Sequence, residues 1–70
     1  MDISINTPIK ITMIKYAIRL RWLGKDRKWH QKTTKYHELS SDAWDEAERI
    51  EQHIDYLEMS RRLVRKEFKL

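Results

Sequence analysis

The sequence predicts an α+β fold, in which an antiparallel β-hairpin of two strands, or alternatively three, packs against one long C-terminal α-helix. Residues 9–23 alternate apolar and basic side chains, which is typical of a half-buried strand. Residues 40–70 contain neither Gly nor Pro and repeat apolar residues at helical spacing. The 70 residues are therefore expected to form one domain, with a leader (1–8), a hairpin region (9–39) and a helix (40–70).

In the first predicted strand, apolar and basic side chains lie on opposite faces from residue 14 onward. The apolar face holds Ile14, Tyr16, Ile18, Leu20 and Trp22, and the other face holds Lys15, Ala17, Arg19 and Arg21. Upstream, Ile9, Ile11 and Met13 alternate in the opposite phase. Because side chains in a strand have a period of two, this change of phase predicts a bulge or break between Met13 and Ile14.

The only Gly of the chain, Gly24, begins the one strong turn signal, which separates the two predicted strands. A short turn centred on Lys25-Asp26 would place Trp22 opposite Trp29. The alternation falters near residue 34. The second segment, 28–39, is therefore either one strand or two shorter strands, 28–33 and 35–39.

The predicted helix has a well-marked beginning. Ser40 fits the N-cap position, with Leu39 and Trp44 as a hydrophobic staple, so Trp44 is expected in the core together with Trp22. Apolar residues then recur at alternating spacings of four and three, interrupted once by an arginine. These positions are Ala43, Ala47, Ile50, Ile54, Leu57, Arg61, Val64 and Phe68.

A helix of this length, about 43 Å, would extend past a strand of about 30 Å. Its last turns would then expose apolar side chains that need a partner. The chain has no Cys, so no disulfide can stabilise its small core, and oligomerisation is the expected substitute. The sequence thus predicts a homodimer. Its predicted interface residues are Met59, Arg61, Leu63, Val64 and Phe68.

Positive charge is concentrated in the hairpin region and favours an anionic partner. The formal net charge is +4, and the first forty residues carry nine Lys and Arg against three acids. A basic β-ribbon can enter a DNA groove, and Trp29 and Tyr36 could stack on unpaired bases. The predicted nucleic-acid-binding residues are Lys15, Arg19, Arg21, Arg27, Lys28, His30 and Lys32. The alternative is a solvated face whose bases prevent aggregation.

The predicted helix is acidic in its first half and basic in its last twelve residues. Complementarity to the helix dipole explains part of this division. However, like charges four residues apart, such as Arg61 and Arg65, each cost a few tenths of a kcal/mol. A second copy of the helix packed antiparallel, or a phosphate backbone, would compensate for them.

The sequence contains no catalytic or metal-binding signature. His30, His37 and His53 lack the spacing of metal ligands, and no Ser is placed beside a base and an orienting group. We therefore expect a non-enzyme without cofactor or metal. The apolar runs are too short for a membrane span and the N-terminus does not resemble a signal peptide, so a cytoplasmic protein without membrane contact is expected.

These observations favour a small, non-catalytic nucleic-acid-binding or regulatory accessory protein. The alternative is an inhibitor or adaptor that docks its basic sheet face or helix overhang on an acidic host protein. Strands followed by a helix, with a basic sheet, resemble the layout of the small amino-terminal arm-binding domains of phage integrases. The size, charge and lack of Cys resemble phage and plasmid accessory proteins.

Overall fold

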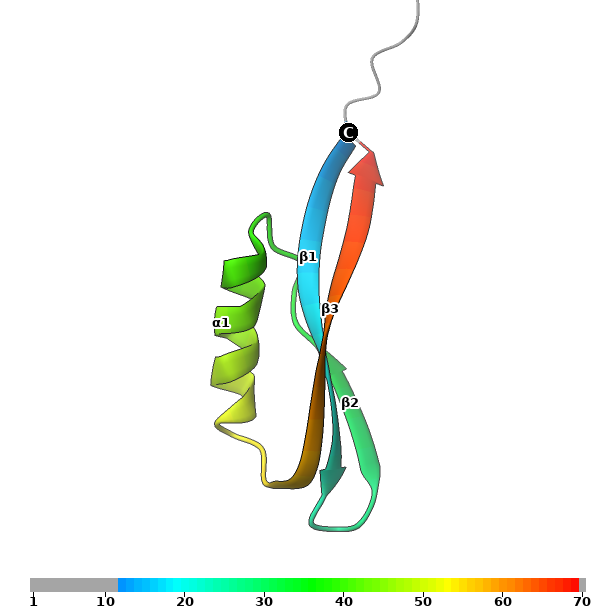
Figure 1. The fold of residues 1–70 in the computed structure, drawn as a ribbon, viewed down its shortest axis with the longest axis vertical. Coiled ribbons are helices and arrows are strands. Elements are labelled where there is room, and N and C mark those ends of the chain that lie inside the picture. The colour runs from blue at the N-terminus through cyan, green and yellow to red at the C-terminus, as the bar shows by residue number, and fades with distance from the viewer. Residues whose placement is uncertain (1–11, 70) are drawn as a thin grey trace, which may run out of the picture.

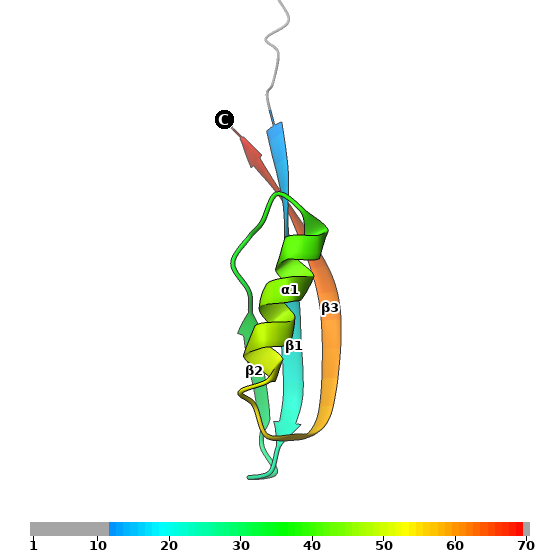
Figure 2. The ribbon, with the colours of Figure 1, turned by 90° about the vertical axis from the view of Figure 1, so that its left-hand side faces the viewer.

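The computed structural model describes residues 12–69, which form three strands and one helix. Strands β1 (Thr12–Gly24), β2 (Trp29–Thr33) and β3 (Tyr56–Lys69) make an antiparallel sheet in the order β2-β1-β3. Helix α1 (Ser40–Glu51) precedes β3 in the chain and lies along β1 on one side of the sheet (Figures 1 and 2). Within the described residues, no helix covers the opposite side, which we call the open face.

The predicted long C-terminal helix is wrong. Helix α1 has twelve residues and ends at Glu51, and the last part of the chain is the 14-residue strand β3. Strand β2 pairs with only one end of the 13-residue β1, whereas β3 pairs with β1 from Thr12 to Gly24. If residues 56–69 were a helix, the backbone N–H and C=O groups on the edge of β1 that now pairs with β3 would have no partners. The helix overhang therefore does not exist, and most of the described chain is sheet.

The core forms where α1 meets β1. Ile18 and Leu20 are fully buried against Ala43 and Ala47 of the helix. Tyr16, Trp22, Ile50 and Met59 surround them and are partly buried. The predicted apolar face of the first strand is therefore confirmed. Burying a Leu or Ile side chain contributes about 1.5–3 kcal/mol, so the two residues at the centre carry a large share of the stability.

The start of α1 differs by one residue from the expectation. Leu39 occupies the N-cap position without a side-chain hydrogen bond, and Ser40 is already helical. Leu39 is 59% exposed and Trp44 is 40% exposed, so the predicted staple and the core position of Trp44 are both wrong. The helix docks through the small Ala43 and Ala47 instead.

Strand β1 continues through Met13 and Ile14 without the predicted bulge. Met13 pairs with Phe68 and Ile14 with Glu67, and the register with β3 shifts only between Leu23 and Gly24. Met13 lies on the open face beside an aromatic neighbour, so its apolar side chain does not require the helix-covered face. Ile9 and Ile11, and the predicted leader 1–8, lie outside the described residues.

The β1–β2 hairpin is shifted by one residue from the expected register. Trp22 pairs with His30, and Trp29 pairs with Leu23. Arg27 adopts a left-handed backbone (φ 64°), and its N–H donates to the Gly24 carbonyl at 2.9 Å. The turn thereby gains a third loop residue. A one-residue shift exchanges faces, so Trp29 joins the open face while His30 and Lys32 lie on the helix side.

Two side chains approach the backbone closely at Gly24. A Cβ at this position would lie 2.5 Å from Asp26 Oδ1 and 3.1 Å from the His30 ring. The Lys28 N–H donates to Asp26 at 3.1 Å, and the His30 ring nitrogen lies 3.1 Å from the same carboxylate. The Lys28 hydrogen bond, followed by the contact with His30, lowers the pKa of Asp26 below its ordinary value.

The segment between β2 and α1 is fixed to β1 by hydrogen bonds rather than by a second strand. Thr34 is buried, and its hydroxyl accepts the Ile18 N–H and donates to the Lys35 carbonyl, both at 2.9 Å. His37 forms an isolated bridge with Tyr16. Residues 35–39 thus contribute one bridge, and β2 itself ends at Thr33.

Candidate nucleic-acid interface

The strand register gathers basic residues on the open face. Directly opposed residues in an antiparallel pair point to the same side of the sheet, so the open-face positions of β1 define those of β3. The bases that share this face are Lys15, Arg19, Arg21, Arg62 and Lys66. Among the described strand residues, Glu58 is the only acid on the open face, and it lies at one end, opposite Leu23. The open face is therefore strongly positive.

Three arginines line one hollow in the middle of this face. The hollow has a volume of about 270 Å³. Its lining residues are Arg19, Arg21, Gln31, Ser60 and Arg62. All three strands contribute, because Arg19 pairs with Arg62 of β3 and Arg21 pairs with Gln31 of β2. The lining consists of hydrogen-bond donors and contains no carboxylate, and we call this feature the arginine hollow.

The charges in the arginine hollow are uncompensated within the described chain. Arg19 and Arg62 are direct cross-strand neighbours, and like charges in this position destabilise a sheet. Within residues 12–69, neither they nor Arg21 form an ion pair. The Nε of Arg19 is buried and has no hydrogen-bond partner there. An unpaired buried donor costs about 1–3 kcal/mol. A bound anion would compensate for the repulsion between the guanidinium groups.

An aromatic pair surrounded by lysines occupies one end of the open face. The rings of Tyr36 and Phe68 meet edge to face, with centroids 5.5 Å apart. Lys15 Nζ and Lys66 Nζ each lie 5.3 Å from the centroid of the Phe68 ring, and Lys66 Nζ lies 5.7 Å from that of Tyr36. These are cation–π distances, and they fix aromatic rings and positive charges at the same place.

A third aromatic residue stands at the other end. Trp29 is 52% exposed, and the Arg21 guanidinium lies 4.9 Å from its ring centroid. Since Trp29 pairs with Leu23 while Phe68 pairs with Met13, the arginine hollow lies between the two aromatic ends. The open face thus combines aromatic ring surfaces with guanidinium and ammonium groups.

The structure places the predicted nucleic-acid-binding residues in three different locations. Lys15, Arg19 and Arg21 come together on the open face. Arg27 and Lys28 lie in the turn between β1 and β2. His30 and Lys32 lie on the helix side of β2, where His30 stacks on Trp22 with a centroid distance of 5.5 Å and contacts Asp26.

The sequence interpretation missed Arg62 and Lys66 on β3 and gave Phe68 a different role. Apolar and polar residues do not alternate over residues 60–68, so the place of Arg62 and Lys66 follows only from the pairing of β3 with β1. The predicted interface residues do not share one surface. Met59, Arg61 and Leu63 lie on the helix side of β3, while Val64 and Phe68 lie on the open face.

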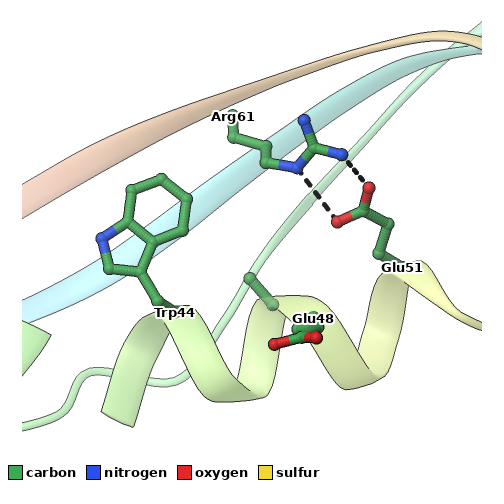
Figure 3. A pocket seen from close by; sticks show the side chains of 5 residues that line it. Trp44, Glu48, Glu51 and Arg61 are labelled. Atoms are coloured by element: carbon green, nitrogen blue, oxygen red, sulfur yellow. Dashed lines mark hydrogen bonds and ion pairs between the residues drawn. The ribbon is translucent and has the colours of Figure 1, made fainter. Parts of the chain in front are cut away.

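A second hollow lies between α1 and β3 and has a volume of about 330 Å³. Figure 3 shows Arg61 between Trp44 and Glu51, with its guanidinium group turned toward Glu51. The Arg61 guanidinium donates to both carboxylate oxygens of Glu51, with Nε 3.0 Å from Oε2. Its basic group is therefore neutralised internally, in contrast to the three arginines of the open face.

Other kinds of site are less well supported by the described part of the chain. Residues 12–69 contain no cluster of three or more His, Asp or Glu suited to a metal ion. Their only helix is too short and too polar to cross a membrane. Comparisons of the chain with protein-family models, curated proteins and solved structures found no match. The interpretation of the open face therefore depends on its geometry and charge.

Proposed function

We propose that this protein is a non-catalytic nucleic-acid-binding protein that contacts the phosphate backbone through its open face. The observation that carries this proposal is the arginine hollow, where Arg19, Arg21 and Arg62 meet and form no ion pair with any residue of 12–69. Guanidinium groups bind phosphate oxygens with two parallel hydrogen bonds, so a phosphate in the hollow would pair with donors that form no ion pair within the described residues.

The flanking lysines extend the same chemistry along the sheet. Lys15 and Lys66 are direct cross-strand neighbours, and the pair Ala17 and Val64 separates them from Arg19 and Arg62 along the open face. A chain of phosphates would neutralise several of these bases together. Their combined release of counterions would make binding strongly dependent on salt.

An acidic host protein remains the alternative partner. It would have to use the open face, because the helix overhang that offered a second docking site does not exist. The aromatic rings among the Lys and Arg residues favour nucleic acid as the partner. Nucleobases stack on aromatic rings, whereas the carboxylates of an acidic protein do not need them.

The test is fluorescence anisotropy with labelled single-stranded and duplex DNA, over a salt series that begins near 50 mM. We expect binding that weakens linearly in a double-logarithmic plot, with a slope of about −0.7 to −0.9 per phosphate contact. The double variant R19E/R62E should lose at least about 100-fold in affinity, since it reverses two charges in the hollow.

The matched control is R49E/R65E, which makes the same change in net charge away from the open face. Arg49 is exposed on α1 and Arg65 is exposed on the helix side of β3. This control should keep most of the affinity, and circular dichroism should confirm that both variants fold. Absence of binding at low salt, or equal losses in the two variants, would overturn the proposal.

A further inference from the structure

The aromatic residues of the open face have a definite order relative to its Lys and Arg residues. Phe68 stands opposite Met13 and Trp29 opposite Leu23, with Arg19 and Arg21 between them along β1. The stretch of β1 from Met13 to Leu23 is about 33 Å long at 3.3 Å per residue. An extended chain lying along β1 would therefore meet aromatic rings, then the arginine hollow, then another aromatic ring.

Trp29 exposes a large ring at the turn end of the edge strand β2. A tryptophan is a large apolar side chain, yet Trp29 is 52% exposed and its only described cation–π neighbour is Arg21. The guanidinium lies over the ring at 4.9 Å, so a base stacked on the tryptophan would also lie close to a positive charge. Stacking on a protein ring and contact with phosphate are combined in this way by proteins that bind single strands.

A duplex would make poor use of these rings. The bases of a duplex stack on one another and present only their edges in the grooves. The ring surfaces of Trp29 and Phe68 would then face sugar, phosphate and water. Unpaired bases expose their faces and can stack on Trp, Tyr or Phe with little dependence on sequence.

We infer that the open face binds single-stranded nucleic acid in preference to duplex. One base stacks on Trp29, another stacks on the pair Tyr36 and Phe68, and the phosphates between them enter the arginine hollow. This inference rests on the proposed function and specifies its substrate class. It predicts affinity with weak sequence preference, because ring stacking and phosphate contacts do not read base edges.

The experiment compares wild-type protein with the variants W29L and W29F, using labelled oligo(dT) of about 12 nucleotides and a hairpin duplex. We expect wild type to bind the single strand at least tenfold more tightly than the duplex at equal salt. W29L should lower affinity for the single strand about tenfold and affinity for the duplex less than twofold. W29F keeps an aromatic ring and should restore most of the loss.

The matched control is W44L, which removes a tryptophan of comparable exposure from the helix side. Trp44 is 40% exposed and lines the hollow between α1 and β3. Its removal should leave both affinities unchanged. Binding of oligo(dT) should also quench tryptophan emission in wild type and W44L, and this quenching should be much smaller in W29L.

The outcomes separate this inference from the proposed function. Equal affinities for single strand and duplex, or a W29L effect that is the same on both, would overturn the preference for single strands. The proposed function would still stand if R19E/R62E abolished binding. If R19E/R62E had no effect on either probe, the proposed function and the inference would both fail. F68L provides a second stacking test at the other end of the face.

Discussion

The two faces of strand β1 differ sharply in what surrounds them. On the helix side, Ile18 and Leu20 are fully buried under α1. On the open face, Arg19 and Arg21 point from the same strand into a hollow lined by donors. Alternate residues of one strand thus serve stability on one face and, in the proposed function, recognition on the other. Substitutions on the two faces should therefore have separable effects on unfolding free energy and on affinity.

The largest expected effect comes from the helix-covered face. L20A should lower the free energy of unfolding by about 2–5 kcal/mol, because it leaves a cavity beneath α1. L63A should cost less than about 1 kcal/mol, since Leu63 is 45% exposed. Urea denaturation followed by circular dichroism measures both values. Equal losses for the two variants would mean that the core extends along β3 and that Leu63 contributes to it as much as Leu20 does.

A smaller effect should come from the contact that ties α1 to the β2–α1 segment. Burial alone would raise the pKa of Glu46, but hydrogen bonds from the His37 ring at 2.6 Å and the Lys35 N–H outweigh it, so that this pKa lies below its ordinary value of 4.5. A lowered pKa means that ionised Glu46 stabilises the fold above about pH 4.5, and that this stability is lost as the pH falls through the pKa in the folded state.

E46Q should therefore lose on the order of 1 kcal/mol near pH 7. It should also lose less stability than wild type as the pH falls below 4.5, because one ionised group that favours folding is absent. Urea midpoints measured between neutral pH and pH 3 compare the two proteins. Parallel curves would show that Glu46 does not contribute to acid sensitivity. Oligonucleotide affinity at pH 7 should be unchanged, because Glu46 lies on the helix side.

The smallest expected effect on stability comes from the turn between β1 and β2. Arg27 has a left-handed backbone that costs a non-Gly residue about 1–2 kcal/mol. R27G should raise the free energy of unfolding by about 0.5–1 kcal/mol, after the entropic cost of Gly is included. K25G is the control, since Lys25 does not share this conformation, and it should destabilise slightly. A loss of stability in R27G would show that the arginine side chain contributes more than its backbone strain costs.

The sequence was informative where neighbouring residues decide the structure. The alternation from Ile14 to Trp22 reflects one strand with one buried face, so both the buried set and the basic set could be predicted. Lys15, Arg19 and Arg21 were found for the same reason. The turn at Gly24 was also predicted. Its register, however, depends on the left-handed backbone of Arg27, and an arginine gives no sequence signal for that conformation.

The end of the helix could not be predicted in the same way. Residues 56–69 are rich in Leu, Glu, Met, Arg and Lys, which are good helix formers, and no Gly or Pro separates them from α1. Pairing with β1 overrides this local preference, because it satisfies a full edge of backbone groups. Arg62 and Lys66 were missed because their place beside Arg19 and Lys15 depends on that long-range pairing.

The pairing of β1 with β3 also has a consequence for how the chain folds. Thr12 pairs with Lys69, so the first and last described residues meet across the entire intervening chain. Such contacts carry a high loop-closure entropy and form slowly, whereas a hairpin and a short helix can form early. The arginine hollow needs Arg62 of β3 beside Arg19 of β1. The proposed phosphate binding should therefore appear only with the slow closure of the sheet, because a partly folded chain does not yet bring these two arginines together.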